Sequence, residues 1–304
     1  MIPECPICKE DNYTVIYDRL QVPAIHVVKC NHCSHIYTLQ NDETEIEGLY
    51  TNDVYQVVEN RHTVFDKILS WEYGRVIDKI NGLKVEKGSL LDFGCGKGKF
   101  ANLAQRKGWQ VKCIETAEAR ADYAKKVYGL DVDTHSYTGG KVFTDEFDVL
   151  TLFHVLEHLP DPQNLLSELI KHNLAKDGLV VIEVPNFRSL QAYIARSKWI
   201  HLDVSRHKSH FTQSQIEQVA LKSGLVPQKT TFFSFHLGVL GMTDALMKMF
   251  GYRRNLIYEL KNKKTIGLTL GIAALLPFSF LLEAGAAVAG YGGVIRKYFI
   301  QKPA

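Results

Sequence analysis

The sequence predicts a mixed α/β fold in which helices cover both faces of a mainly parallel sheet. Three observations support this prediction. From residue 89 onward, short apolar runs alternate with amphipathic stretches, as in strand–helix repeats. A glycine-rich turn joins the first apolar run to the first amphipathic stretch. Two C-x-x-C pairs in the first 40 residues indicate a small separate module before the sheet.

The expected elements follow one another in a regular order. Residues 62–80 have the apolar spacing of a helix, and the strand–helix repeats come after it. Strands are expected at residues 89–94, 110–115, 130–135, 147–154, 178–185, 225–235 and 293–302. Helices are expected at residues 98–108, 118–129, 161–174 and 212–224.

The helix boundaries carry their own local signals. Asp161 stands before a proline and can cap the helix that begins there. Thr212 and Gln215 have the spacing of a capping box. Gly108 and Gly129 follow the last helical residues, where a left-handed conformation ends a helix. These signals mark where the expected helices begin and end.

The composition limits the classes of function. With 46% apolar and 23% charged residues among 304, the chain can bury a core. Its net charge of +3 is too small to indicate a nucleic-acid partner. The first residues lack the basic and then apolar pattern of a signal peptide, so we expect a cytoplasmic protein.

The cysteine pairs predict a zinc ribbon over residues 1–40. Cys5 with Cys8, and Cys30 with Cys33, form two turns about twenty residues apart, and short strands lie between them. Redox cysteines or disulfides are the alternatives. A shell of four thiolates leaves no open position, so the Zn²⁺ would be structural. The neighbouring His35 is expected on the surface.

The turn after the first strand predicts a ligand site. Gly94 would let the chain leave the strand, Gly96 would let a ligand approach the backbone, and Gly98 would let the helix pack closely. Asp92 before the turn suits a cationic ligand better than a pyrophosphate. Glu115 ends the second strand, where a carboxylate can accept ribose hydroxyls. NAD, FAD or another adenosine ligand remains possible for such a turn alone.

The stretches "LLDFGCGKGKF", "VKCIETA" and "FDVLTLFHVLEHLPDP" resemble the successive motifs of class I S-adenosylmethionine-dependent methyltransferases. With the preceding ribbon, the chain resembles a bacterial subgroup that methylates sugars, cell-surface glycans or lipids. The resemblance implies a Rossmann-like seven-stranded sheet and S-adenosyl-L-methionine as cofactor. Family members often bind the adenine amine through an acid after the third strand, and no counterpart is evident in "DTHSYT". The implied cofactor-binding residues are Asp92, Gly94, Cys95, Gly96, Gly98, Glu115, Thr116, Phe153 and His154.

Two clusters are candidates for catalysis, because methyl transfer to oxygen or carbon needs a base and a positioned acceptor. The first is His154, Glu157 and His158 in "HVLEH", and the second is His207 and His210 in "SRHKSHFT". Both follow strand ends where the site should lie. An architectural role is the alternative for the first cluster, and a surface position for the second. "HVLEH" also invites a metal interpretation, but it is not H-E-x-x-H.

An apolar insert at residues 236–292 separates the last two strands. Glu283 is the single charge in about thirty of its residues. Since the chain must return to a neighbouring strand, and Pro277 interrupts the stretch, we expect a re-entrant hairpin that contacts an anionic membrane surface. A dimer interface or buried helices are the alternatives. The flanking basic residues are Arg253, Arg254, Lys261, Lys263, Lys264, Arg296 and Lys297.

The sequence thus predicts a zinc ribbon at 1–40, a linker at 41–61 and a methyltransferase domain at 62–304. We expect methyl transfer to a hydroxyl or carbon of a sugar, glycan or lipid-linked acceptor, beside the inner membrane. The alternative is a non-catalytic nucleoside-binding adapter in a membrane assembly complex. The oligomeric state stays open.

Overall fold

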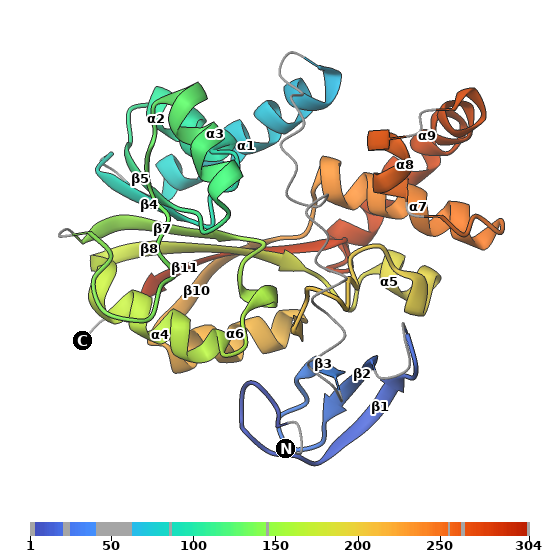
Figure 1. Ribbon diagram of the computed structural model, residues 1–304, viewed down its shortest axis with the longest axis horizontal. Coiled ribbons are helices and arrows are strands. Elements are labelled where there is room, and N and C mark those ends of the chain that lie inside the picture. The colour runs from blue at the N-terminus through green and yellow to red at the C-terminus, as the bar shows by residue number, and fades with distance from the viewer. Residues whose placement is uncertain are drawn as a thin grey trace.

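The computed structural model describes residues 4–20, 25–40, 63–84, 87–143, 146–254, 256–262 and 265–302 (Figure 1). The expected linker at 41–61 lies outside these residues.

The centre of the molecule is a seven-stranded sheet with the order β10-β11-β8-β7-β4-β5-β6. Strands β4 to β8 are parallel, whereas β11 runs antiparallel between β8 and β10. This topology confirms the predicted seven-stranded α/β sheet. The strands are β4 Ser89–Phe93, β5 Gln110–Ile114, β6 Asp131–Asp133, β7 Phe147–Phe153, β8 Leu174–Pro185, β10 Leu225–Thr231 and β11 Val294–Gln301.

Helices cover both faces of this sheet, as the alternating pattern predicts (Figure 1). One face carries α1 Val64–Leu83, α2 Lys99–Arg106 and α3 Glu118–Tyr128, and the other carries α4 Pro162–Asn173 and α6 Gln213–Lys222. Asp161 caps α4 through the backbone N–H of Asn164 at 3.0 Å, and Thr212 with Gln215 forms the expected capping box. Local sequence signals therefore set these helix starts.

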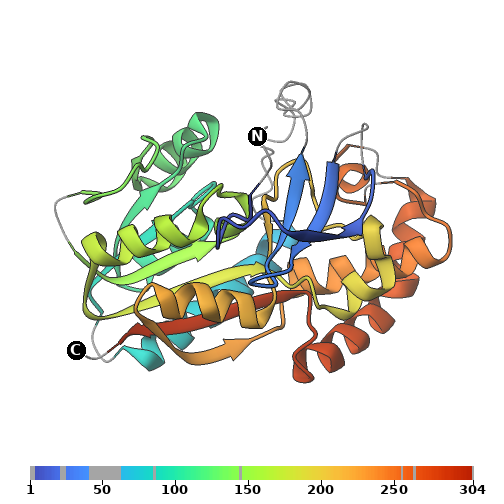
Figure 2. The ribbon, with the colours of Figure 1, turned by 90° about the horizontal axis from the view of Figure 1, so that it is seen from below.

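The amino-terminal ribbon is a small antiparallel sheet that the main domain extends. Its strands are β1 Tyr13–Tyr17, β2 Ile25–Cys30 and β3 Ile36–Gln40, and β9 Ser209–His210 pairs with the edge of β3. Figure 2 shows the ribbon beside α4 and α6. Because β9 covers this edge, His35 is buried and bonds the Ser209 hydroxyl at 3.0 Å. The expected surface position of His35 is wrong.

The insert folds as helices beside the sheet. These are the π-helix η5 Phe235–Val239, α7 Leu240–Met249, α8 Leu256–Asn262 and α9 Ile266–Val288, with α5 Leu190–Ala195 packed on α7. Two single 3₁₀ turns, η3 Leu156–His158 and η4 Arg196–Lys198, lie in the preceding loops.

The expected re-entrant hairpin is wrong, because Pro277 lies inside one continuous helix, α9. Leu268 on one side of the proline and Glu283 on the other are buried, so both halves of α9 pack against the rest of the molecule. Length and composition alone would let α9 cross a membrane. Most of its side chains are exposed in the structure.

Two of the basic residues expected to face a membrane are buried instead. Arg296 pairs with Glu72 and Glu183, and Lys297 pairs with Glu217. Both lie on β11 within the sheet, where helices cover the side chains on each face. The side chains of Lys261, Lys263 and Lys264 lie outside the described residues, and Arg253 and Arg254 are exposed.

Gly98 begins α2 with a φ of 75°, and an added Cβ would lie 2.9 Å from the Ala124 Cβ and 2.5 Å from the Leu130 side chain. Gly98→Ala should therefore lower the free energy of unfolding by roughly 2–5 kcal/mol, through left-handed strain and overpacking together. Gly96→Ala is the matched control, because Gly96 has a φ of 57° and open space around it. It should cost only about 1–2 kcal/mol. Urea denaturation measures both, and equal losses would contradict the packing argument.

Candidate functional site

The glycine turn between β4 and α2 leaves open space at its middle residue. A Cβ on Gly94 would lie 2.6 Å from Val155, and one on Gly98 would lie 2.5 Å from the Leu130 side chain and 2.9 Å from Ala124 of α3. At Gly96 an added Cβ would meet nothing within 4 Å. The backbone at Gly96 is therefore accessible to a ligand. This is the role that the sequence predicts for it.

Glu115 shapes this turn from the end of β5. Its Oε2 accepts the backbone N–H of Gly96 at 2.8 Å, and its Oε1 accepts that of Ala117 at 2.8 Å. Each carboxylate oxygen keeps a second lone pair that a ribose hydroxyl can use. Thr116 follows as an exposed residue, and the Cys95 thiol stays close to the Gly96 carbonyl at 3.7 Å.

Asp92 is a buried carboxylate at the end of β4. Its Oδ1 accepts the Thr151 hydroxyl at 2.7 Å. Burial raises its pKa to about 7, the nearby Glu115 charge adds to the rise, and the Thr151 hydrogen bond opposes it. A cationic ligand at this strand end would favour the ionised form. Asp92 therefore fits the role of facing the charged methionine end of S-adenosylmethionine.

A carboxylate also stands at the end of β6, the third strand along the chain of the main sheet. The Glu115 N–H donates to the Asp133 carbonyl at 3.0 Å, so the two residues are neighbours. The Asp133 side chain accepts from the backbone and ring of His135 at 2.9 and 2.7 Å. Asp133 begins the "DTHSYT" stretch, so an acid does stand where none is evident from the sequence pattern.

His154 follows β7 in a left-handed conformation, with a φ of 56°. Its Nδ1 donates to Glu157 at 3.1 Å and its Nε2 to Glu183 at 3.0 Å. Burial alone would lower the pKa of His154, but the two carboxylates outweigh it and raise the pKa to about 10. Because both ring nitrogens donate hydrogen bonds to carboxylates, His154 is a protonated imidazolium with no lone pair left to accept a proton from a substrate. This geometry favours the architectural alternative for His154.

The preceding residue, Phe153, packs into the interior rather than into open space. Its ring centroid lies 4.8 Å from that of Phe100 and 6.3 Å from that of Tyr73. Phe153 thus supports the strand end from the α1 and α2 side of the sheet. Direct contact of Phe153 with the cofactor stays a prediction.

The ion pairs of His154 are one part of a longer buried series of charges, which we call the charge ladder. It consists of Glu157, His154, Glu183, Arg296 and Glu72. Glu183 on β8 faces Arg296 on β11 across the sheet register. Arg296 bonds Glu72 of α1 at 3.2 Å, and Glu72 accepts the His236 ring N–H at 2.9 Å. Glu72 and Glu183 are absent from the residues predicted for the site, and Arg296 is predicted to face a membrane. The isolated charges in "GLVVIEVP" and "GVIRKYF" are the signal that could have found them.

The two predicted catalytic clusters come together in space. The Lys208 N–H donates to the Glu157 carbonyl at 2.7 Å, and the rings of His158 and His207 lie 4.7 Å apart. His210 instead turns toward the ribbon, where its Nε2 bonds the Thr38 hydroxyl at 2.9 Å. Burial lowers the pKa of His210 to about 4. The catalytic assignment of these residues stays a prediction.

The four ribbon cysteines converge on one point and are all free thiols. The Sγ atoms of Cys5 and Cys33 lie 3.5 Å apart, as do those of Cys8 and Cys30. Thiolates on a tetrahedral zinc, with Zn–S of about 2.3 Å, lie about 3.8 Å from one another. The arrangement of the four cysteines therefore fits a zinc ion. The Sγ atoms are too far apart for the alternative disulfide bonds.

The raised pKa of Asp92 predicts a pH-dependent affinity for S-adenosylmethionine. A cation placed beside Asp92 lowers its pKa below about 7, so binding at pH 6 releases a proton and affinity rises with pH. Up to a tenfold gain, about 1.4 kcal/mol, is expected between pH 6 and pH 7.5, with a plateau above. Calorimetry in buffers of different ionisation enthalpy measures the proton release. Asp92→Asn should flatten the profile, and an unchanged slope in this variant would rule the assignment out.

Comparisons with known proteins find methyltransferases. Ubiquinone biosynthesis O-methyltransferase of Actinobacillus pleuropneumoniae serotype 7 is 32% identical over 126 residues, which are 38% of this chain and 52% of that protein. The enzyme of the same name from Hydrogenovibrio crunogenus is 26% identical over 178 residues, 51% of this chain and 73% of that protein. The chain thus spans about half the length of the first of these relatives.

A solved structure shares the fold. The plantazolicin methyltransferase BpumL, in complex with a triazolic desmethylPZN analog and SAH, has a TM-score of 0.50 and 16% identity over 83% of this chain and 90% of that one. The family model described as "Methyltransferase domain" matches residues 65–229, more than half of the 304 residues. This match includes the glycine turn, Asp92, Glu115 and the charge-bearing ends of β7 and β8. The chain belongs to the class I S-adenosylmethionine-dependent methyltransferases.

Proposed function

We propose that this methyltransferase transfers the methyl group to a hydroxyl or carbon of a sugar, glycan or lipid-linked acceptor at the cytoplasmic face of a membrane. The name of the curated relatives, O-methyltransferase, favours oxygen over carbon as the acceptor atom. The observation that carries the proposal is a pocket in which the ribbon, the strand ends of the sheet and the insert meet.

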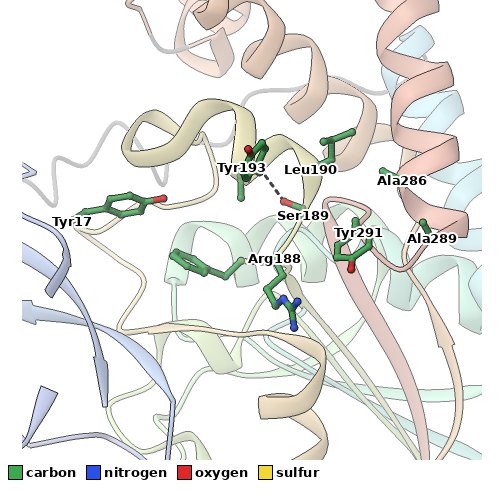
Figure 3. A pocket seen from close by; sticks show the side chains of 10 residues that line it. Tyr17, Arg188, Ser189, Leu190, Tyr193, Ala286, Ala289 and Tyr291 are labelled. Carbon is green, nitrogen blue, oxygen red and sulfur yellow. Dashed lines mark hydrogen bonds between the residues drawn. The ribbon is translucent and has the colours of Figure 1, made fainter. Parts of the chain in front are cut away.

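The pocket has a volume of about 620 Å³ and lies beyond the carboxyl end of β8 (Figure 3). Tyr17 lines it from the ribbon and Tyr291 from the segment before β11, with Phe187 and Tyr193 between them. Such a volume fits one or two sugar rings, and aromatic side chains can stack on the apolar faces of those rings. Phe187 also lies 5.8 Å from the His210 ring, so the pocket adjoins the histidine cluster.

Arg188 gives the pocket a positive charge. It lines the wall, is exposed, and has no ion-pair partner among the residues that the structure describes. A guanidinium binds phosphate or carboxylate through two parallel hydrogen bonds. An acceptor with a sugar ring and a phosphate, as a lipid-linked sugar has, would therefore match both the aromatic and the charged wall.

The insert supplies the proposed membrane contact. Ala286 and Ala289 at the end of α9 line the same pocket. The buried residues Leu268, Ser279, Glu283 and Ala286 lie along one side of α9, and an exposed apolar face lies opposite. That apolar face consists of Ile266, Leu270, Phe278, Leu281 and Val288, which are 64–93% exposed. A lipid surface along this face would bring a membrane-anchored acceptor to the pocket.

We also propose a structural Zn²⁺ in the ribbon, held by Cys5, Cys8, Cys30 and Cys33. The converging thiols support this assignment, and four thiolates leave no open position for chemistry. A module of this size buries little apolar surface, so metal binding would stabilise it.

The acceptor assignment is tested by incubating the chain and labelled S-adenosylmethionine with lipid and glycan fractions from cells that lack this gene. Label should enter a lipid-linked or glycan species. Arg188→Gln should raise KM for that acceptor about 10- to 100-fold, because a bidentate ionic contact is lost, and leave the affinity for S-adenosylhomocysteine unchanged. Arg106→Gln, an exposed arginine on α2, is the control. Label in neither fraction, with cofactor binding intact, would refute the acceptor class.

The membrane contact is tested with vesicles of anionic lipid. A variant with Leu270, Phe278 and Leu281 each changed to glutamate should lose flotation with the vesicles, because three apolar contacts become charged. Leu221→Glu, an exposed leucine on α6, should still float. If the triple variant floats as well as the unaltered chain, α9 is not the membrane contact.

A further inference from the structure

Glu157, His158 and His207 form a second group of metal-ligating side chains, distinct from the ribbon cysteines. One ligand atom from each lies within 4.8 Å of the other two. Glu157 and His158 belong to η3 after β7, and His207 belongs to the segment before β9. The hydrogen bond from the Lys208 N–H to the Glu157 carbonyl, 2.7 Å long, fixes these two segments together.

Glu157 has an oxygen without a partner. Its side chain is only 1% exposed, and Oε1 is taken by the His154 ring at 3.1 Å. Oε2 is buried and accepts no hydrogen bond from any residue that the structure describes. A buried carboxylate oxygen left unpaired costs about 1–3 kcal/mol or more, so a native fold normally provides a partner. A bound cation would be such a partner.

Both histidines are oriented as metal ligands usually are. The Nδ1 atom of His207 bonds the His201 carbonyl at 3.0 Å, and that of His158 bonds the Arg206 carbonyl at 3.3 Å. A ring that donates Nδ1–H to a carbonyl presents a lone pair on Nε2. Metal-binding histidines commonly make this outer hydrogen bond. Glu157 has an outer hydrogen bond of the same kind. Its Oε1 accepts from the His154 ring, and its Oε2 stays available to bind a metal ion.

We propose that Glu157, His158 and His207 bind a divalent transition-metal ion such as Zn²⁺. Two histidines and a carboxylate with an open position are the ligand set of catalytic zinc sites. Ligand atoms on a tetrahedral zinc lie about 3.3 Å apart, so the exposed His158 ring would move inward on binding. His154 takes no part as a ligand, because both of its nitrogens are engaged.

The use of this metal rests on the proposed function. An acceptor hydroxyl that occupied the open position would lose its proton to solvent at a lower pH than a free hydroxyl. The resulting alkoxide could then attack the methyl carbon, whose bond to the sulfonium sulfur breaks as S-adenosylhomocysteine leaves. The binding of the metal itself does not depend on the identity of the acceptor.

The experiment is a zinc count on the full chain, reloaded with Zn²⁺ after treatment with a chelator. Two zinc ions per chain are expected, one in the ribbon and one at the new site, and His207→Gln should hold one. His158→Ala, which removes an exposed side chain, should weaken the second zinc at least tenfold without unfolding the chain. His172→Gln, from a partly exposed His–Glu pair on α4, should still hold two.

Cobalt substitution assigns the ions to their sites. Co²⁺ bound to the ribbon thiolates gives an intense sulfur-to-metal absorption, whereas Co²⁺ on nitrogen and oxygen ligands does not. The thiolate band should persist in His207→Gln while the cobalt count falls by one. A single thiolate-bound ion in the unaltered chain, or an unchanged count in His207→Gln and His158→Ala, would overturn the proposal. Failure of the acceptor assignment would look different, because the second metal would still bind.

Discussion

The charge ladder is the constraint on which the rest of this structure depends. Three carboxylates, Glu157, Glu183 and Glu72, are almost fully buried, and the cations His154 and Arg296 alternate with them. Removing one partner from such a buried pair leaves an uncompensated charge and typically costs about 3–5 kcal/mol. The ladder therefore requires β7, β8, β11, α1 and η3 to be in place at the same time. It lies at the strand ends that carry the site.

The ladder also links the site to the insert. Beyond Arg296, Glu72 accepts the backbone N–H of Phe235 at 3.0 Å and the His236 ring at 2.9 Å. These residues begin η5, a π-helix, and such turns often occur at functional sites. The first turn of the insert is thus held by the same carboxylate that bonds Arg296. The first turn of the insert and the imidazolium at His154 therefore belong to one continuous series of polar contacts.

Local rules account for the parts of the fold that the sequence predicts correctly. The capping box at Thr212, the cap at Asp161 and the turn at Gly96 each depend on residues a few positions apart. The ladder depends on pairs such as Glu72 and Arg296, which are 224 positions apart. Their contact follows from the insertion of β11 between β8 and β10, which no short window reveals. The helical Pro277 has the same explanation, since tertiary contacts on both sides override its local preference.

The ribbon holds the segment that carries the histidines of the candidate site. Thr38 on β3 donates its hydroxyl to the His207 carbonyl at 2.7 Å, so it must accept the hydrogen bond from His210. The pairing of Ile36 on β3 with His210 on β9 also fixes the backbone of His210. The segment that carries His207 toward Glu157 is therefore held on one side by the ribbon and on the other by η3. A shift of the ribbon strands would therefore move His207 and His210 through these hydrogen bonds, although the cysteines make no hydrogen bond to either histidine in the part of the chain that the structure describes.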